Sequence, residues 1–209
     1  MPVPAQIEIE SLLVESARSA FGKHKSDGDG DGILRIEWSR AAAGPPELRV
    51  VPRALGPEPD SWLAAISAAT HPGPGKRRNT KFVDVEAYDF AREEVRKSEL
   101  DEVLLFDDEG HLVEGVRSNL ILVTDSGRLV TPDLSLGAVE GLGLELVLES
   151  RPQIAMARLT RDDLASAREL MSINIVRGIV PIVELDGRPI AKGRSGPWAR
   201  RLGSLFGST

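Results

Sequence analysis

Hydrophobic residues recur at helical spacing near the start of the chain, over residues 7–21. Apolar and small side chains return there every three or four residues, with charged side chains between them. This periodicity predicts an amphipathic helix. The same spacing over residues 85–97 predicts a second helix, and its core-facing positions are Ala87, Phe90, Ala91 and Val95. Further helices are predicted at 141–150, behind an N-cap at Thr160, and at about 197–205.

Alternating or continuous apolar runs predict strands between these helices. The first two, at 33–38 and 48–52, flank a turn at 41–46, and a third covers 62–69. The later runs are 102–106, 112–115, 119–124, 170–173 and 180–185, and turns rich in Asp and Gly follow the first at 107–110 and the third at 125–127. Because strands and helices mix without the regular order of βαβ units, the predicted fold class is α+β.

The clearest break in the pattern lies at residues 71–79. This segment contains two Pro, two Gly and the three consecutive cations Lys76, Arg77 and Arg78, and such composition is typical of a linker. The sequence therefore predicts a small N-terminal α+β part over residues 1–70 and a larger domain over residues 80–209.

Composition narrows the functional classes. The 209 residues carry a formal net charge of −6 and no cysteine. The charge gives no basic footprint for nucleic acid, and the absence of cysteine excludes disulfides and thiolate chemistry. The first residues do not resemble a secretory signal, and no window approaches the roughly 18 apolar residues of a membrane span. We therefore expect a cytoplasmic protein without a membrane partner.

Several patterns suggest chemistry that the spacing does not support. Asp27, Asp29 and Asp31 match the first half of a calcium loop, but the twelfth position is Trp38 instead of Glu. We therefore expect an acidic turn without tight calcium binding. The glycines at 137–143 match neither G-x-G-x-x-G nor a P-loop with its Lys and Ser or Thr, so no nucleotide site is expected. Ser118 is not surrounded by the G-x-S-x-G elbow of a nucleophilic serine. The three histidines, His24, His71 and His111, are expected in loops or on the surface.

A different chemistry fits the order of the remaining motifs. Pyridoxal phosphate needs a lysine for an imine, a carboxylate for its ring nitrogen and backbone N–H groups for its phosphate. A lysine strand at 80–84, a carboxylate at Glu114 followed by Ser118 and Asn119, and a glycine-led helix after residue 137 would supply them in that order.

These passages resemble class IV (fold type IV) pyridoxal-phosphate enzymes, the branched-chain aminotransferases and 4-amino-4-deoxychorismate lyases. Thr131-Pro132 and residues 174–187 extend the resemblance. It implies a two-domain fold type IV architecture, a homodimer and a small amino substrate. It also implies that Lys81 forms the imine and acts as the base. The cofactor-binding residues that it implies are Glu114 for the ring nitrogen, Asn119 in support, Val139 against the ring, and Leu142, Gly143 and Ile175 for the phosphate.

The chain also departs from the family pattern. Gly143 and Leu144 stand where the family has Thr and Arg, and Ile175 stands where it has a Ser or Thr hydroxyl. Family members also carry residues before the point where Met1 falls, including an arginine that binds the phosphate. We therefore expect either an N-terminally truncated chain or a degenerate member. The function is correspondingly that of an aminotransferase or lyase of low turnover, or that of a homologue without catalytic activity.

Overall fold

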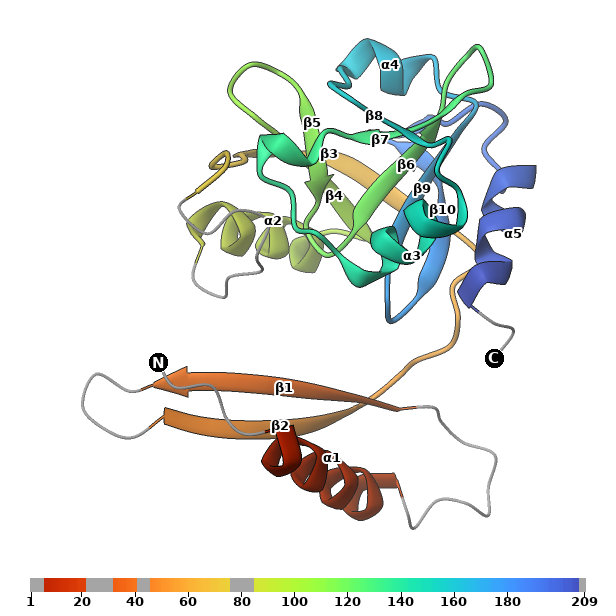
Figure 1. The fold of residues 1–209 in the computed structure, drawn as a ribbon. Coiled ribbons are helices and arrows are strands. Elements are labelled where there is room, and N and C mark those ends of the chain that lie inside the picture. The colour runs from red at the N-terminus through yellow and green to blue at the C-terminus, as the bar shows by residue number, and fades with distance from the viewer. Residues whose placement is uncertain (1–5, 22–31, 41–45, 76–84, 207–209) are drawn as a thin grey trace. The chain divides into compact units, whose positions relative to one another are not determined.

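A computed structural model describes residues 6–21, 32–40, 46–75 and 85–206 (Figure 1). Contacts between backbone positions divide the chain into two units, Met1–Glu58 and Pro59–Thr209. This division precedes the segment 71–79 that the sequence analysis chose as the linker. The difference concerns strand β3 (Trp62–Thr70), which pairs with strands of the second unit on both of its edges.

The first unit contains one helix and one hairpin. Helix α1 (Gln6–Phe21) and strands β1 (Gly32–Arg40) and β2 (Pro46–Ala54) cover the three elements predicted for this region. The two strands are antiparallel and in continuous register, from Gly32 opposite Ala54 to Arg40 opposite Pro46. The candidate calcium ligands Asp27, Asp29 and Asp31 lie outside the described residues.

The second unit is a mixed sheet with helices. Its larger helices are α2 (Glu86–Lys97), α3 (Leu142–Ser150) and α5 (Pro197–Gly203), and α4 (Arg161–Ala165) is shorter. Two 3₁₀ helices, η1 (Leu134–Leu136) and η2 (Ser204–Phe206), complete the helical elements of the described chain. After β3, the strands are β4 (Glu102–Phe106), β5 (Leu112–Gly115), β6 (Asn119–Val123), β7 (Leu129–Pro132), β8 (Ala155–Ala157), β9 (Glu169–Asn174), β10 (Gly178–Leu185) and β11 (Arg188–Pro189).

The strand order of this sheet is β5-β4-β3-β10-β9-β6-β7-β8, and β11 pairs with β10. Strand β3 runs parallel to β4 and β10, β7 runs parallel to β8, and the other pairs are antiparallel. A bridge between Leu112 and Leu159 joins β5, at one end of this order, to the segment that follows β8 at the other end. The sheet therefore curls until its ends meet, which covers edges that would otherwise be exposed.

The core follows the two faces of this curled sheet. On β6, Leu120 and Leu122 belong to a cluster formed mainly by strand residues, whereas Ile121 and Val123 pack on the other face with residues of α3 and α5. This alternation is the period of two expected of a strand. Helix α2 covers a third cluster through Tyr88, Ala91 and Val95.

Most predicted elements occur close to their predicted bounds. The predicted cap at Thr160 is present as a capping box with Asp163. Three short elements, β7, β8 and η1, were not predicted from the sequence. The prediction that Phe90 lies on the core side of α2 is wrong, because this residue is 51% exposed. Among the described residues no helix is long and apolar enough to cross a membrane.

Candidate active site

A cavity of about 420 Å³ opens beside the ends of β5, β6 and β9. Ligand pockets are commonly ~300–1,000 Å³, so this volume suits a small cofactor or substrate. The cavity brings together six residues that the sequence analysis selected, which are Glu114, Asn119, Val139, Leu142, Gly143 and Ile175. Lys81, the seventh, lies outside the described residues. The roles assigned to these residues remain predictions.

Glu114 reaches the cavity because β5 is short and ends in a tight turn. It pairs with Leu105 of β4, and the next residue, Gly115, lies against Glu102 and Ser118. A Cβ at Gly115 would lie 2.7 Å from Ser118 Oγ and 2.8 Å from Glu102 Oε2. Any larger residue at position 115 would therefore have to displace the buried side chains of Ser118 and Glu102. The Glu114 carboxyl group is placed at the cavity wall with only 3% of the residue exposed.

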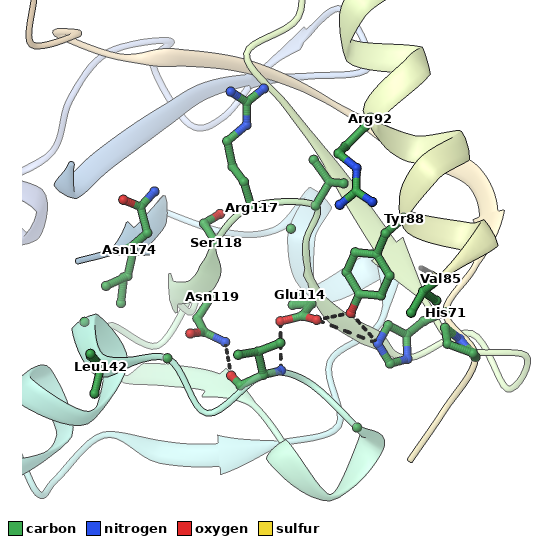
Figure 2. Close-up of a pocket in the computed structure, with 18 of the residues that line it drawn as sticks. His71, Val85, Tyr88, Arg92, Glu114, Arg117, Ser118, Asn119, Leu142 and Asn174 are labelled. Atoms are coloured by element: carbon green, nitrogen blue, oxygen red, sulfur yellow. Dashed lines mark hydrogen bonds and ion pairs between the residues drawn. The ribbon is translucent and has the colours of Figure 1, made fainter. Parts of the chain in front are cut away.

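Both carboxylate oxygens of Glu114 accept hydrogen bonds (Figure 2). The backbone N–H of Val139 donates to Oε2 at 3.0 Å. The hydroxyl of Tyr88, on α2, donates to Oε1. The ring nitrogen Nε2 of His71 lies 3.7 Å from the same oxygen. A buried carboxylate needs such donors because burial otherwise disfavours its charge.

Tyr88 and His71 extend this arrangement and were not selected from the sequence. Tyr88 Oη lies 2.9 Å from His71 Nε2, and the backbone N–H of Gly73 donates to His71 Nδ1 at 3.0 Å. Burial, followed by the charge and hydrogen bond of Glu114, raises the pKa of Tyr88 well above its ordinary value. Its hydroxyl therefore keeps its proton. The helical spacing of Tyr88 with Ala91 and Val95 was the signal that could have found it.

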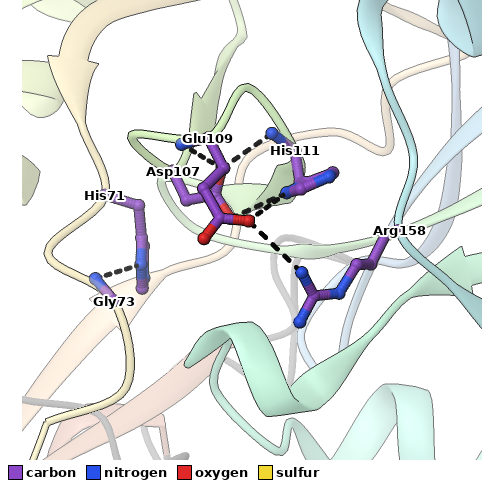
Figure 3. Close-up of polar contacts among 6 residues, drawn as sticks. All are labelled: His71, Gly73, Asp107, Glu109, His111 and Arg158. Atoms are coloured by element: carbon purple, nitrogen blue, oxygen red, sulfur yellow. Dashed lines mark hydrogen bonds and ion pairs between the residues drawn. The ribbon is translucent and has the colours of Figure 1, made fainter.

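The two described histidines have different surroundings, and Figure 3 draws both of them. His71 was expected in a loop or on the surface, but it is 4% exposed and lines the cavity. His71 does lie in a loop, directly after β3 (Trp62–Thr70), but the end of that strand places its side chain in the core and away from the surface. His111 lies outside the cavity, where its Nδ1 is 3.2 Å from Asp107 Oδ2 and 3.7 Å from Glu109 Oε2.

Asn119 holds the other side of Val139. Its side-chain Nδ2 donates to the Val139 carbonyl at 2.8 Å. Val139 is therefore bonded on both sides: its N–H donates to Glu114, and its carbonyl accepts from Asn119. A Cβ at Gly141 would come within 2.3 Å of Asn119 Oδ1, so a larger residue there would displace the Asn119 side chain. Asn119 thus positions the loop that contacts Glu114.

The beginning of α3 forms another wall of the cavity. Gly143 packs so closely on the turn between β9 and β10 that its Cβ would lie 3.0 Å from Asn174 C and 3.1 Å from Ile175 N. The first amides of a helix have no partner inside the helix, and its dipole favours an anion there. Leu142 and Ile175 are 64% and 56% exposed, so this wall is open compared with the Glu114 side.

Two arginines that were not selected from the sequence also line the cavity. Arg92, on α2, pairs with Asp89 at 2.6 Å. Arg117 lies in the turn between β5 and β6, and its guanidinium is 5.8 Å from the centre of the Trp62 ring. Their positions depend on how α2 and the sheet meet, which local sequence does not reveal.

Glu102 is a second buried carboxylate behind this turn. It is fully buried, and Ser118 Oγ donates to its Oε2 at 2.7 Å. Burial raises the pKa of Glu102 to about 7, and the hydrogen bond from Ser118 and the charge of Arg117 oppose that shift. This carboxyl group therefore changes its charge near neutral pH, next to the turn that carries Arg117.

Comparison with protein families adds an independent observation. A family model described as amino-transferase class IV matches residues 10–185, which is more than half of the chain. The chain belongs to this family. Its fold is therefore the fold type IV architecture that the sequence resemblance implied, and solved structures support the same conclusion.

The relatives of this class IV aminotransferase family member are distant and longer. The branched-chain-amino-acid aminotransferase of Pseudomonas aeruginosa is 31% identical over 109 residues, which are 51% of this chain and 35% of that protein. A PLP-bound hypothetical aminotransferase from Mycobacterium tuberculosis has a TM-score of 0.77 at 18% identity, over 99% of this chain and 76% of that one. The branched-chain amino acid aminotransferase of Escherichia coli has a TM-score of 0.73 at 21% identity, over 97% of this chain and 70% of that one. The chain thus spans little more than a third of the curated relative.

Proposed function

We propose that this chain holds pyridoxal phosphate and acts on amino-acid-type substrates, as an aminotransferase or an aminodeoxychorismate-lyase-like enzyme. The observation that carries the proposal is the buried carboxylate of Glu114 at the cavity wall, with each oxygen held by a hydrogen bond. A carboxylate so placed suits a protonated ring nitrogen, because the opposite charges attract and the two hydrogen bonds keep the acceptor oxygens in position.

The described residues fit two of the three needs of the cofactor. Glu114 supplies the carboxylate, and the first amides of α3 with that of Ile175 lie together at another wall, where a phosphate would be held. The third need, the amine, rests on the sequence alone, through Lys81. The side chains at the phosphate wall offer no hydroxyl at residues 143, 144 and 175, which predicts weak affinity.

The residues of this chain then have distinct tasks. Bound pyridoxal phosphate would withdraw electrons from the amino substrate. Glu114 holds a proton on the ring nitrogen, and Val139 and Asn119 keep that carboxylate in place. Lys81 accepts and returns the proton at the substrate Cα, for which an amine tuned toward neutral pH is suited.

Titration of the purified chain with pyridoxal phosphate tests the proposal. We expect a visible-edge absorbance band that borohydride fixes covalently and that Lys81→Ala removes, with half-saturation at a high cofactor concentration. Lys97→Ala is a matched control, since Lys97 is exposed at the end of α2 and pairs with Glu93. A band that survives Lys81→Ala would overturn the assignment.

The alternative is a family member that binds without turnover. It is favoured by Gly143, Leu144 and Ile175, which replace the hydroxyls and cation that the family uses for phosphate. A clear band without transamination of ordinary amino donors would support this alternative. The homodimer and the cytoplasmic location stay predictions, and light scattering at micromolar concentration would test the first.

A further inference from the structure

A chain of hydrogen bonds with a defined direction leads to Glu114 from the end of β3 (Figure 2). Because the Gly73 N–H donates to His71 Nδ1, a neutral imidazole carries its proton on Nε2. That N–H faces Tyr88 Oη at 2.9 Å, so the tyrosine oxygen accepts. The single hydroxyl proton of Tyr88 is then free to be donated to Glu114 Oε1. His71 therefore determines which way the tyrosine hydroxyl points.

We propose that His71 is a positioning residue, which acts through Tyr88 to keep Glu114 a fixed acceptor for the ring nitrogen of the cofactor. This inference rests on the proposed function, and it assigns roles to two residues that touch Glu114 from outside the family motif. His71 and Tyr88 are 17 residues apart, and Tyr88 and Glu114 are 26 apart. The curled sheet and α2 bring the three together.

The acceptor capacity of Glu114 leaves room for a ligand. A carboxylate offers about four lone-pair positions, and Val139 and Tyr88 are the donors within hydrogen-bond distance among the described residues. A protonated ring nitrogen can therefore be added without displacing either donor. Donors in a chain polarise one another, so the N–H of His71 strengthens the bond that Tyr88 donates.

Loss of the His71 imidazole would remove the constraint on the Tyr88 hydroxyl. The Tyr88 oxygen would lose its donor, and its hydroxyl could rotate away from Glu114. The carboxylate would keep Val139 on Oε2 but would lose its support on Oε1. The effect of changing His71 must consequently depend on the presence of the Tyr88 hydroxyl.

A double-mutant cycle on cofactor affinity tests that dependence. We expect Tyr88→Phe to weaken pyridoxal phosphate binding about tenfold, as one lost hydrogen bond to a charged group predicts. His71→Phe acts through that same bond and should weaken binding measurably, by up to the same factor. The double variant should bind no more weakly than Tyr88→Phe alone. His71→Gln keeps an N–H near the position of Nε2 and should retain most of the affinity. His111→Gln, outside the cavity, is the control and should bind like the unchanged protein.

Multiplicative effects of His71→Phe and Tyr88→Phe would show that His71 acts independently, and would overturn the inference. Wild-type affinity in His71→Phe would overturn it too. Thermal unfolding of each apo-variant identifies any that fail to fold. If His71→Phe is one of them, His71→Asn, a polar residue whose amide is too short to reach Tyr88 Oη, takes its place in the cycle with the same expected result.

A measurement without cofactor separates this inference from the proposed function. The sequence contains one tyrosine, Tyr88, so incorporation of 3-fluorotyrosine gives a single ¹⁹F resonance from the site. We expect His71→Phe and Glu114→Gln each to shift this resonance and His111→Gln to leave it unchanged. If the chain binds no pyridoxal phosphate but these shifts occur, the proposed function fails and the network stands. If His71→Phe leaves the resonance in place, the positioning role of His71 is refuted.

Discussion

Two histidine–carboxylate networks in the larger unit use the same kinds of group in different surroundings. His71 Nε2 lies 3.7 Å from Glu114 Oε1, and both side chains are at most 3% exposed. His111 Nδ1 lies at the same distance, 3.7 Å, from Glu109 Oε2, but these side chains are 20% and 66% exposed (Figure 3). Geometry alone would give them equal weight.

Burial makes the two networks unequal. Water competes for the exposed groups and salt screens their charges, so pairs of this kind contribute little. In the buried network each lost partner leaves a polar atom without a substitute, and that penalty is larger than the net value of the bond. The buried network therefore holds Glu114 in place, whereas the His111–Glu109 pair lies on the hairpin between β4 and β5 and adds little to stability.

The largest expected effect is the loss of stability on removing the carboxylate of the buried network, compared with removing that of the exposed one. Glu114→Ala leaves the Tyr88 hydroxyl and the Val139 N–H unpaired, and we expect a loss of about 3 kcal/mol in the free energy of unfolding. Glu109→Ala should cost less than about 1 kcal/mol. Urea denaturation followed by circular dichroism measures both. Equal losses in the two variants would show that burial does not distinguish the networks.

Glu102 tests whether burial acts on a carboxylate that has no histidine. Its pKa rises from 4.5 to about 7 on folding, chiefly through burial. The folded state then holds the Glu102 proton more tightly than the unfolded state does. The contribution of Glu102 to the free energy of unfolding is therefore complete below pH 4.5 and is lost as the pH rises toward 7. The loss over that window should reach about 3 kcal/mol.

Glu102→Gln is the matched variant, since the amide oxygen can still accept from Ser118 and carries no charge. The dependence of stability on pH between 4.5 and 7 should flatten in this variant, and its stability above that window should exceed that of the unchanged protein. Denaturation curves across this pH range provide the comparison. Parallel pH profiles for the two proteins would exclude Glu102 as the cause.

A smaller effect is expected at the exposed wall of the cavity. Ile175→Thr adds a hydroxyl beside the first turn of α3, where the phosphate would lie, and should tighten pyridoxal phosphate binding about threefold to tenfold. Ile175→Val is the control, since valine has nearly the same shape as threonine but no hydroxyl. The affinities come from absorbance titration. Equal affinities in Thr and Val variants would place the phosphate elsewhere.

The smallest effect is expected in the exposed network. Arg158 Nη1 lies 3.3 Å from Glu109 Oε2, with side chains that are 54% and 66% exposed. Arg158→Ala should change the free energy of unfolding by less than about 1 kcal/mol, and high salt should reduce the difference further. Denaturation at low and at high salt measures it. A loss comparable with that of Glu114→Ala would contradict the comparison.

The sequence predicted the elements better than it predicted their contacts. The strands at Glu114 and Asn119 and the helix after Gly141 follow from local apolar patterns and glycines, because each pattern reflects the face that its own element buries. Phe90 shows the limit of this reasoning, since its helical position suited the core but the sheet lies on the side of Tyr88 and Ala91. Strand β8 has only three residues, which are too few to show the alternation that predicts a strand.

The sequence by itself determined the α+β class, the order of the cofactor motifs and the membership of Glu114, Asn119 and Gly143 in one candidate site. Only the tertiary structure decided that β3 belongs to the larger sheet, and that His71 and Tyr88 meet the carboxylate of Glu114. The physical reason is that local periodicity records whether a residue is buried, whereas its partner depends on strand order and on the curl of the sheet. Such long-range pairing is absent from any single segment of the chain.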